Sequence, residues 1–175
     1  MSVAALLALT SITSCSSKTE PADPYSAEIR RAAATATSDF EKEALSDSKV
    51  SRAEYEEAVS RFIECVRQKG VAIEKIDQFG YYIYETITAP NALAAQDECN
   101  KGTKAVIEPL YVSRLTNPNK ADPNQLFAAC LLKHGAAPAG YSAETAKRDK
   151  SESFANAPYD SSDPRVTQCL ANPVL

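Results

Sequence analysis

Tryptophan is absent from this chain of 175 residues, histidine occurs once, and glycine occurs five times. A single histidine, His134, excludes any metal site built from several imidazoles. So few glycines leave no glycine-rich loop to hold a phosphate group. The hydrolase pattern G-x-S-x-G and the metalloprotease pattern H-E-x-x-H are both missing. We therefore expect neither a cofactor nor a resident metal.

Basic patches are also missing from the sequence. Lysine and arginine number 19 against 23 acidic residues, which gives a formal net charge of −4. Nucleic-acid-binding domains carry clustered positive charge, so nucleic acid is not an expected partner. Charged residues make up 24% and hydrophobic residues 44% of the chain, as in ordinary globular proteins.

The N-terminus carries the longest uncharged apolar run, residues 1–12, which is shorter than the ~20 residues that span a bilayer. It ends in Ile12, Thr13, Ser14 and Cys15. An apolar stretch followed by small residues is typical of a cleaved secretory signal. The tetrapeptide also resembles the bacterial lipobox, whose cysteine receives the lipid (palmitate among its acyl chains) and becomes the first mature residue. We expect residues 1–15 to be a lipoprotein signal peptide, with Cys15 the lipidated residue.

One feature of this segment departs from a secretory signal. No lysine or arginine precedes Cys15, whereas signal peptides begin with a basic region. Either the true translation start lies upstream or the assigned start is misplaced. The competing interpretation is that Val3–Leu9 is the frayed apolar N-terminus of a soluble domain. The expected location is the outer face of the cytoplasmic membrane, with the N-terminal lipid as the membrane contact.

Composition divides the remaining chain into three parts. Residues 16–25 are small, polar and proline-containing, which is typical of a flexible spacer. Residues 26–50 carry a weak, alanine-rich helical stripe that is either a stalk or a docked helix. Residues 51–175 carry stronger patterns and form the expected globular domain, with half-repeats at about 51–115 and 122–175.

Helix starts are well marked in the globular part. Ser51 and Glu54 form a capping box, in which each side chain satisfies a free amide at the helix start. Asp122-Pro123 and Asp163-Pro164 each combine an N-cap carboxylate with proline in the first turn. Residues 71–73 and 79–88 are β-branched and aromatic, and they predict a hairpin connected by residues 75–78.

Four cysteines follow Cys15, namely Cys65, Cys99, Cys130 and Cys169. An even number in an exported chain indicates two disulfides, for which three connectivities are possible. A zinc site is the competing interpretation, but the short C-x-x-C spacing typical of such sites is missing.

An internal repeat favours one connectivity. Phe62, Cys65 and Gly70 have the same spacing as Phe127, Cys130 and Gly135, and a second cysteine lies 34 or 39 residues further on. Each copy thus predicts a helix, a glycine stop, an insert and a second helix, with one cysteine per helix. This favours the pairs Cys65–Cys99 and Cys130–Cys169. The expected fold is mainly α with a minor β-hairpin (α+β), built from two diverged, disulfide-stapled halves.

This paired F-x-x-C-x-x-x-x-G…C arrangement behind a lipobox resembles a set of small uncharacterised actinobacterial cell-envelope lipoproteins. The resemblance covers about residues 62–175. It implies an extracytoplasmic, lipid-anchored protein of the cell envelope and carries over no catalytic residue.

Two groups of side chains are candidates for chemistry. Tyr82 and Tyr84 lie two residues apart in the predicted hairpin, so they share one face and could stack against a glycan or small solute. His134 could act as a general base in a small hydrolase, but it also sits where an imidazole caps a helix C-terminus. The favoured interpretation is a non-catalytic envelope protein with a binding or structural role and an unidentified cell-wall or protein partner. A Tyr-dependent binding lipoprotein and a His134-dependent hydrolase are the alternatives.

Overall fold

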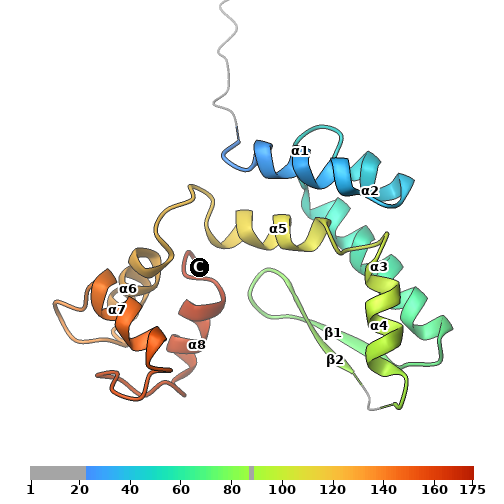
Figure 1. Cartoon of the computed structure of the whole chain (residues 1–175). Coiled ribbons are helices and arrows are strands. Elements are labelled where there is room, and N and C mark those ends of the chain that lie inside the picture. Colours follow the sequence, from blue (N-terminus) through green and yellow to red (C-terminus); the bar gives the residue numbers. More distant parts are fainter. Residues whose placement is uncertain (1–22, 87–88) are drawn as a thin grey trace, which may run out of the picture.

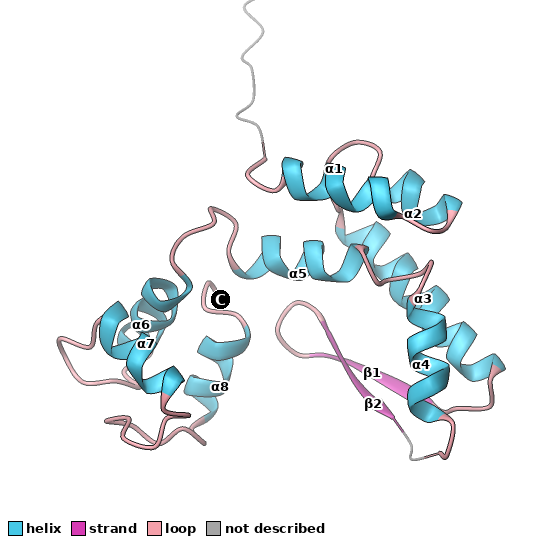
Figure 2. Cartoon of the chain, viewed as in Figure 1, coloured by secondary structure: helices cyan, strands magenta, loops and turns pink. Residues whose placement is uncertain are grey.

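The computed structural model describes residues 23–86 and 89–175 (Figures 1 and 2). The predicted signal peptide, Cys15 and most of the predicted spacer lie outside the described residues. Within the described part the chain forms helices and one two-stranded antiparallel sheet. The helices are α1 (Ser26–Thr35), α2 (Asp39–Ala44), α3 (Arg52–Gln68), α4 (Ala92–Asn100), α5 (Ile107–Thr116), α6 (Pro123–Lys133), α7 (Ala143–Ser151) and α8 (Pro164–Ala171). The strands are β1 (Ile73–Asp77) and β2 (Tyr82–Thr86). The predicted fold class, mainly α with a minor hairpin, is confirmed.

The strong helix starts are where the sequence predicted them. The Ser51 hydroxyl accepts a hydrogen bond from the Glu54 amide, and the Glu54 carboxylate accepts from the Ser51 amide at 2.7 Å. Asp122 and Asp163 each accept from a backbone amide two residues on, at 2.7 and 2.8 Å. These bonds satisfy amides that a helix start leaves without an internal partner.

Two predicted boundaries were wrong. The single helix expected at the start of the stalk region is two helices, because Ser38 and Glu41 form a second capping box that starts α2. The hairpin turn lies at residues 78–81 rather than 75–78, with Asp77 opposite Tyr82. Gly80 adopts φ +81° in this turn, a conformation that favours glycine. The position of Gly80 places the turn three residues later than the aromatic run suggested.

The N-terminal half has a core on both sides of α3. One side carries Tyr55, Val59 and Phe62, which pack with the hairpin and α4. The other side buries Ala58 with α1, α2 and α5, including Ile29 and Ile107. Helices α1 and α2 therefore lie against α3 and α5, as Figure 1 shows.

The C-terminal half has a core of its own. Helices α6, α7 and α8 enclose Phe127, Leu131, Ala146 and Val166, all buried. Tyr141 donates a hydrogen bond to the buried carboxylate of Asp149 at 2.9 Å, and its hydroxyl is 3.0 Å from that of Tyr159. In Figure 1 these three helices form a separate group on the far side of α5 from α3 and α4.

Each half contains one disulfide. Cys65–Cys99 joins α3 to α4, and Cys130–Cys169 joins α6 to α8, with Cα atoms 5.6 Å apart in both. The pairing predicted from the repeat is confirmed. Because all four cysteines form disulfides, they are not available as zinc ligands.

Non-covalent contacts hold the halves together. The side chain of Asn172, which is 1% exposed, donates a buried hydrogen bond to the Phe79 carbonyl at 2.9 Å. The Tyr81 hydroxyl donates to the Ala171 carbonyl at 3.4 Å. The tip of the hairpin thus rests against the end of α8. Among the described residues, no helix combines the length and the apolar character needed to cross a bilayer.

Candidate functional site

The two tyrosines predicted to bind a ligand face α3. Tyr82 stacks on Tyr55 with ring centroids 5.6 Å apart, and Tyr84 meets Phe62 edge-on at 5.5 Å. Both rings pack against the buried cluster of the N-terminal half. Their shared face, predicted from the strand spacing, is therefore the face that covers the core.

The hydroxyl groups of this aromatic cluster converge on Glu108 of α5. The carboxylate accepts hydrogen bonds from Tyr84 at 2.6 Å and from Tyr55 at 3.3 Å, and it forms an ion pair with Lys104. Burial is the main cause that raises the pKa of Tyr84 and of Tyr55. Both phenols therefore stay protonated at neutral pH and act as hydrogen-bond donors to the carboxylate.

Arg52, at the first position of α3, connects the same cluster to the hairpin. Its guanidinium donates to Glu56 and Asp77 at 2.7 Å each, to the Gly80 carbonyl at 2.6 Å and to the Tyr82 hydroxyl at 3.2 Å. A longer contact of 3.4 Å reaches Tyr111. These bonds use all three guanidinium nitrogens, so Arg52 works as an internal brace and has little capacity left for a ligand.

His134 lies at the C-cap position of α6, beside the second disulfide. One of its ring nitrogens and the sulfur atoms of Cys130 and Cys169 all lie within 4.8 Å of one another. The two sulfur atoms are bonded to each other, so in this state they are neither thiolate nucleophiles nor metal ligands. Nε2 is buried and has no hydrogen-bond partner among the described residues.

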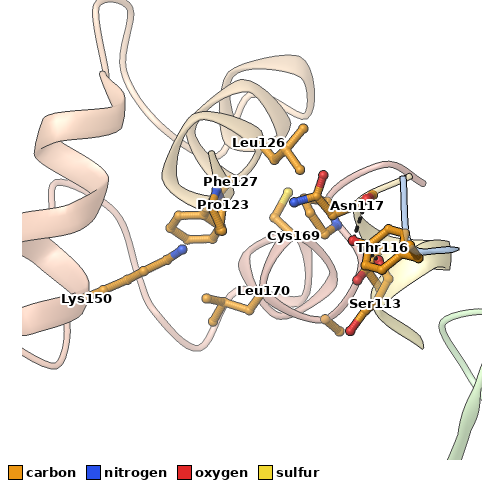
Figure 3. A pocket seen from close by; sticks show the side chains of 12 residues that line it. Ser113, Thr116, Asn117, Pro123, Leu126, Phe127, Lys150, Cys169 and Leu170 are labelled. Atoms are coloured by element: carbon orange, nitrogen blue, oxygen red, sulfur yellow. Dashed lines mark hydrogen bonds between the residues drawn. The ribbon is translucent and has the colours of Figure 1, made fainter. Parts of the chain in front are cut away.

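A pocket of about 250 Å³ opens where the two halves meet. Its walls come from the end of α5, from α6, and from α8 with the residues after it (Figure 3). Leu126, Phe127 and Leu170 contribute apolar side chains to its lining, and Thr116 and Asn117 contribute polar ones. Cys169 lines the pocket as well, and Lys150 reaches it from α7.

Comparison with known proteins gave no relative: no family model, no curated protein and no solved structure matches this chain. The aromatic cluster is internally paired, His134 lies beside a closed disulfide, and the pocket between the halves is concave and partly apolar.

The sequence analysis did not single out Lys150. Lys150 belongs to a charged stretch of α7 that also contains Lys147. What separates the two is that Lys150 is half-buried and faces the pocket, whereas Lys147 is exposed. That difference depends on the packing of α7 on α6, which no local pattern reports.

Proposed function

We propose that this protein is a non-catalytic interaction module, held at the outer face of the cytoplasmic membrane by a lipid on Cys15. The observation that carries the proposal is the complete pairing of the four later cysteines. Disulfides of this kind persist in oxidising compartments outside the cytoplasm. Because they consume Cys65, Cys99, Cys130 and Cys169, Cys15 is the odd cysteine and stands at the end of a lipobox-like sequence.

The internal pairing of the polar clusters supports a role without catalysis. An active site needs a nucleophile, acid or base that is free to reach a substrate. The carboxylate of Glu108 is held by two tyrosines and Lys104, and Arg52 is fully engaged. An interaction module needs only a stable surface, which two disulfide-stapled cores provide. In this proposal the resemblance to actinobacterial envelope lipoproteins extends to location and not to any reaction.

The spacer is long enough for such a tether. Nine residues separate Cys15 from Tyr25, and an extended chain spans at most about 3.5 Å per residue. The helical body would then stand within roughly 35 Å of the membrane surface. A partner in the inner part of the cell wall, or a protein at the membrane surface, fits this reach.

Substitution of the lipidated residue tests the proposal. The Cys15→Ala protein should be lost from the membrane fraction of a bacterial host or remain unprocessed, whereas Ser16→Ala should stay in that fraction. Intact mass measurement should show a diacyl or triacyl adduct on Cys15 of the unchanged protein. One acyl chain binds membranes only marginally, so at least two are expected. An unmodified chain that begins at Met1 in native membranes would refute the anchor.

A further inference from the structure

The pocket between the halves contains a single charged group. Of the described residues that line it, only Lys150 carries a charge. No carboxylate lies within 4.0 Å of its Nζ among the residues described, which sets it apart from Lys104, Lys120 and Arg52 with their ion pairs. Lys150 thus presents a cation without an ion pair to a partly apolar cavity.

The protein groups around Lys150 offer its ammonium group fewer hydrogen bonds than water would. Nζ lies 4.4 Å from the centroid of the Phe127 ring and 3.4 Å from Oδ1 of Asn124. Its burial lowers its pKa, and the charge of Asp122 opposes this only in part. An ammonium group has three donors, and one long hydrogen bond uses at most one of them. Two donors are left for a ligand.

Three other polar side chains of the pocket donate hydrogen bonds within the protein. The Tyr25 hydroxyl donates toward the Ser113 and Asn117 carbonyls, at 3.1 and 2.8 Å. The Thr116 hydroxyl donates to the Val112 carbonyl at 2.9 Å. The Asn117 amide group donates to the Ala121 carbonyl at 2.8 Å. The only charged donors of the pocket are therefore those of Lys150, while the Ser113 hydroxyl and the second N–H of the Asn117 amide offer neutral ones.

We propose that this pocket binds a small monocarboxylate with an apolar body. The carboxylate lies against the Lys150 ammonium group, and the apolar part lies along Leu126, Phe127 and Leu170 (Figure 3). One cation matches one negative charge, which favours a carboxylate over a phosphate dianion. The volume of about 250 Å³ is below the 300–1,000 Å³ of pockets for drug-sized molecules, so the ligand is small.

Titration of the full chain, with both disulfides formed, by octanoate and by octanol tests this assignment. The two probes share an eight-carbon chain and differ in charge. Amide NMR shifts should place both at Leu126, Leu170 and Asn117, with octanoate bound roughly tenfold or more tightly, as expected for a charge-assisted hydrogen bond. In Lys150→Met, which keeps the length of the side chain, that preference should disappear. Lys147→Met, on the exposed face of α7, is the matched control and should keep it.

Three results would overturn the assignment. These are equal affinities for octanoate and octanol in the unchanged protein, an equal loss of octanoate binding in the Lys147 variant, and shifts confined to residues outside the pocket. The disulfides and the amide spectrum of Lys150→Met show whether it is folded; if it is not, Lys150→Gln replaces it. None of these results bears on the lipid anchor, which the membrane fractionation tests separately.

Discussion

Removal of the second disulfide should destabilise one half of the molecule and leave the other almost unchanged. Cys130 and Cys169 are 39 residues apart, and both lie in the core of α6, α7 and α8. In the chain-entropy treatment, closing a loop of that length costs the unfolded chain about 13 cal/mol/K, which corresponds to about 4 kcal/mol at 25 °C. The double variant Cys130→Ala/Cys169→Ala should lose stability of this order.

The effect should be local because the two cores share no residue. The buried cluster around Phe127 and Leu131 contains only residues after position 120, while the clusters around α3 contain only residues before it. Peptide-resolved hydrogen exchange should therefore show lost protection in α6, α7 and α8, with α3 and α4 retaining theirs. Denaturant unfolding should give the size of the loss.

Removal of the first disulfide should give the opposite distribution of lost hydrogen-exchange protection. Cys65 and Cys99 are 34 residues apart, so Cys65→Ala/Cys99→Ala should cost nearly the same, again about 4 kcal/mol, but in α3 and α4. If either variant weakened protection equally in both halves, the two cores would form one cooperative unit and the reasoning would fail. A loss below about 1 kcal/mol in either variant would refute the loop-entropy argument.

Two further predictions concern the last helix and the residue that follows it. Asn172→Ala should lower the free energy of unfolding by about 1–3 kcal/mol, because it leaves the buried Phe79 carbonyl without a donor. Urea unfolding measures this loss. The control Asn156→Ala, at an exposed position, should lower the free energy of unfolding only slightly. Hydrogen bonds from Arg165, first from its side chain and then from its backbone, lower the pKa of Asp163 from 3.8 to about 2. Since the folded-state pKa is the lower one, this stabilisation is complete above about pH 4 and is lost as the pH falls toward 2. Asp163→Asn keeps an N-cap oxygen without the titration, so the acid-induced loss should be smaller in that variant, and an unchanged acid profile would contradict the assignment.

Local signals in the sequence were sufficient for the helix starts and for the disulfides. Ser51 with Glu54, and Asp122 with Pro123, act within four residues of one another, so their chemistry can be recognised without the fold. The disulfide pairs followed from a repeat that the sequence itself displays. The second capping box, Ser38 with Glu41, is equally local. The sequence pattern could therefore have predicted a new helix start within the alanine-rich stripe.

Long-range packing decided what the sequence did not show. The hairpin turn is braced by Arg52, which lies 28 residues before Gly80. The side of Tyr82 and Tyr84 that meets the core depends on Tyr55 and Glu108, which come from two other helices. The pocket requires Tyr25, α5, α6, α7 and α8 together. None of these contacts has a signature in a short window of sequence. The aromatic run therefore predicted a binding surface at Tyr82 and Tyr84, and nothing in the sequence pattern indicated Lys150.

The positions of the two disulfides also determine how the molecule would respond to mechanical load. Neither bond crosses from one half to the other, and the halves meet through weak contacts such as that of Asn172 with Phe79. A force applied between a membrane tether and a bound partner would separate the halves first. The loops closed by the disulfides could not lengthen. Residues 100–129 lie between the two closed loops, and these 30 residues could extend by up to about 100 Å without breaking a covalent bond. The described residues before Cys65 also lie outside the closed loops, so only residues 65–99 and 130–169 keep a fixed chain length under load.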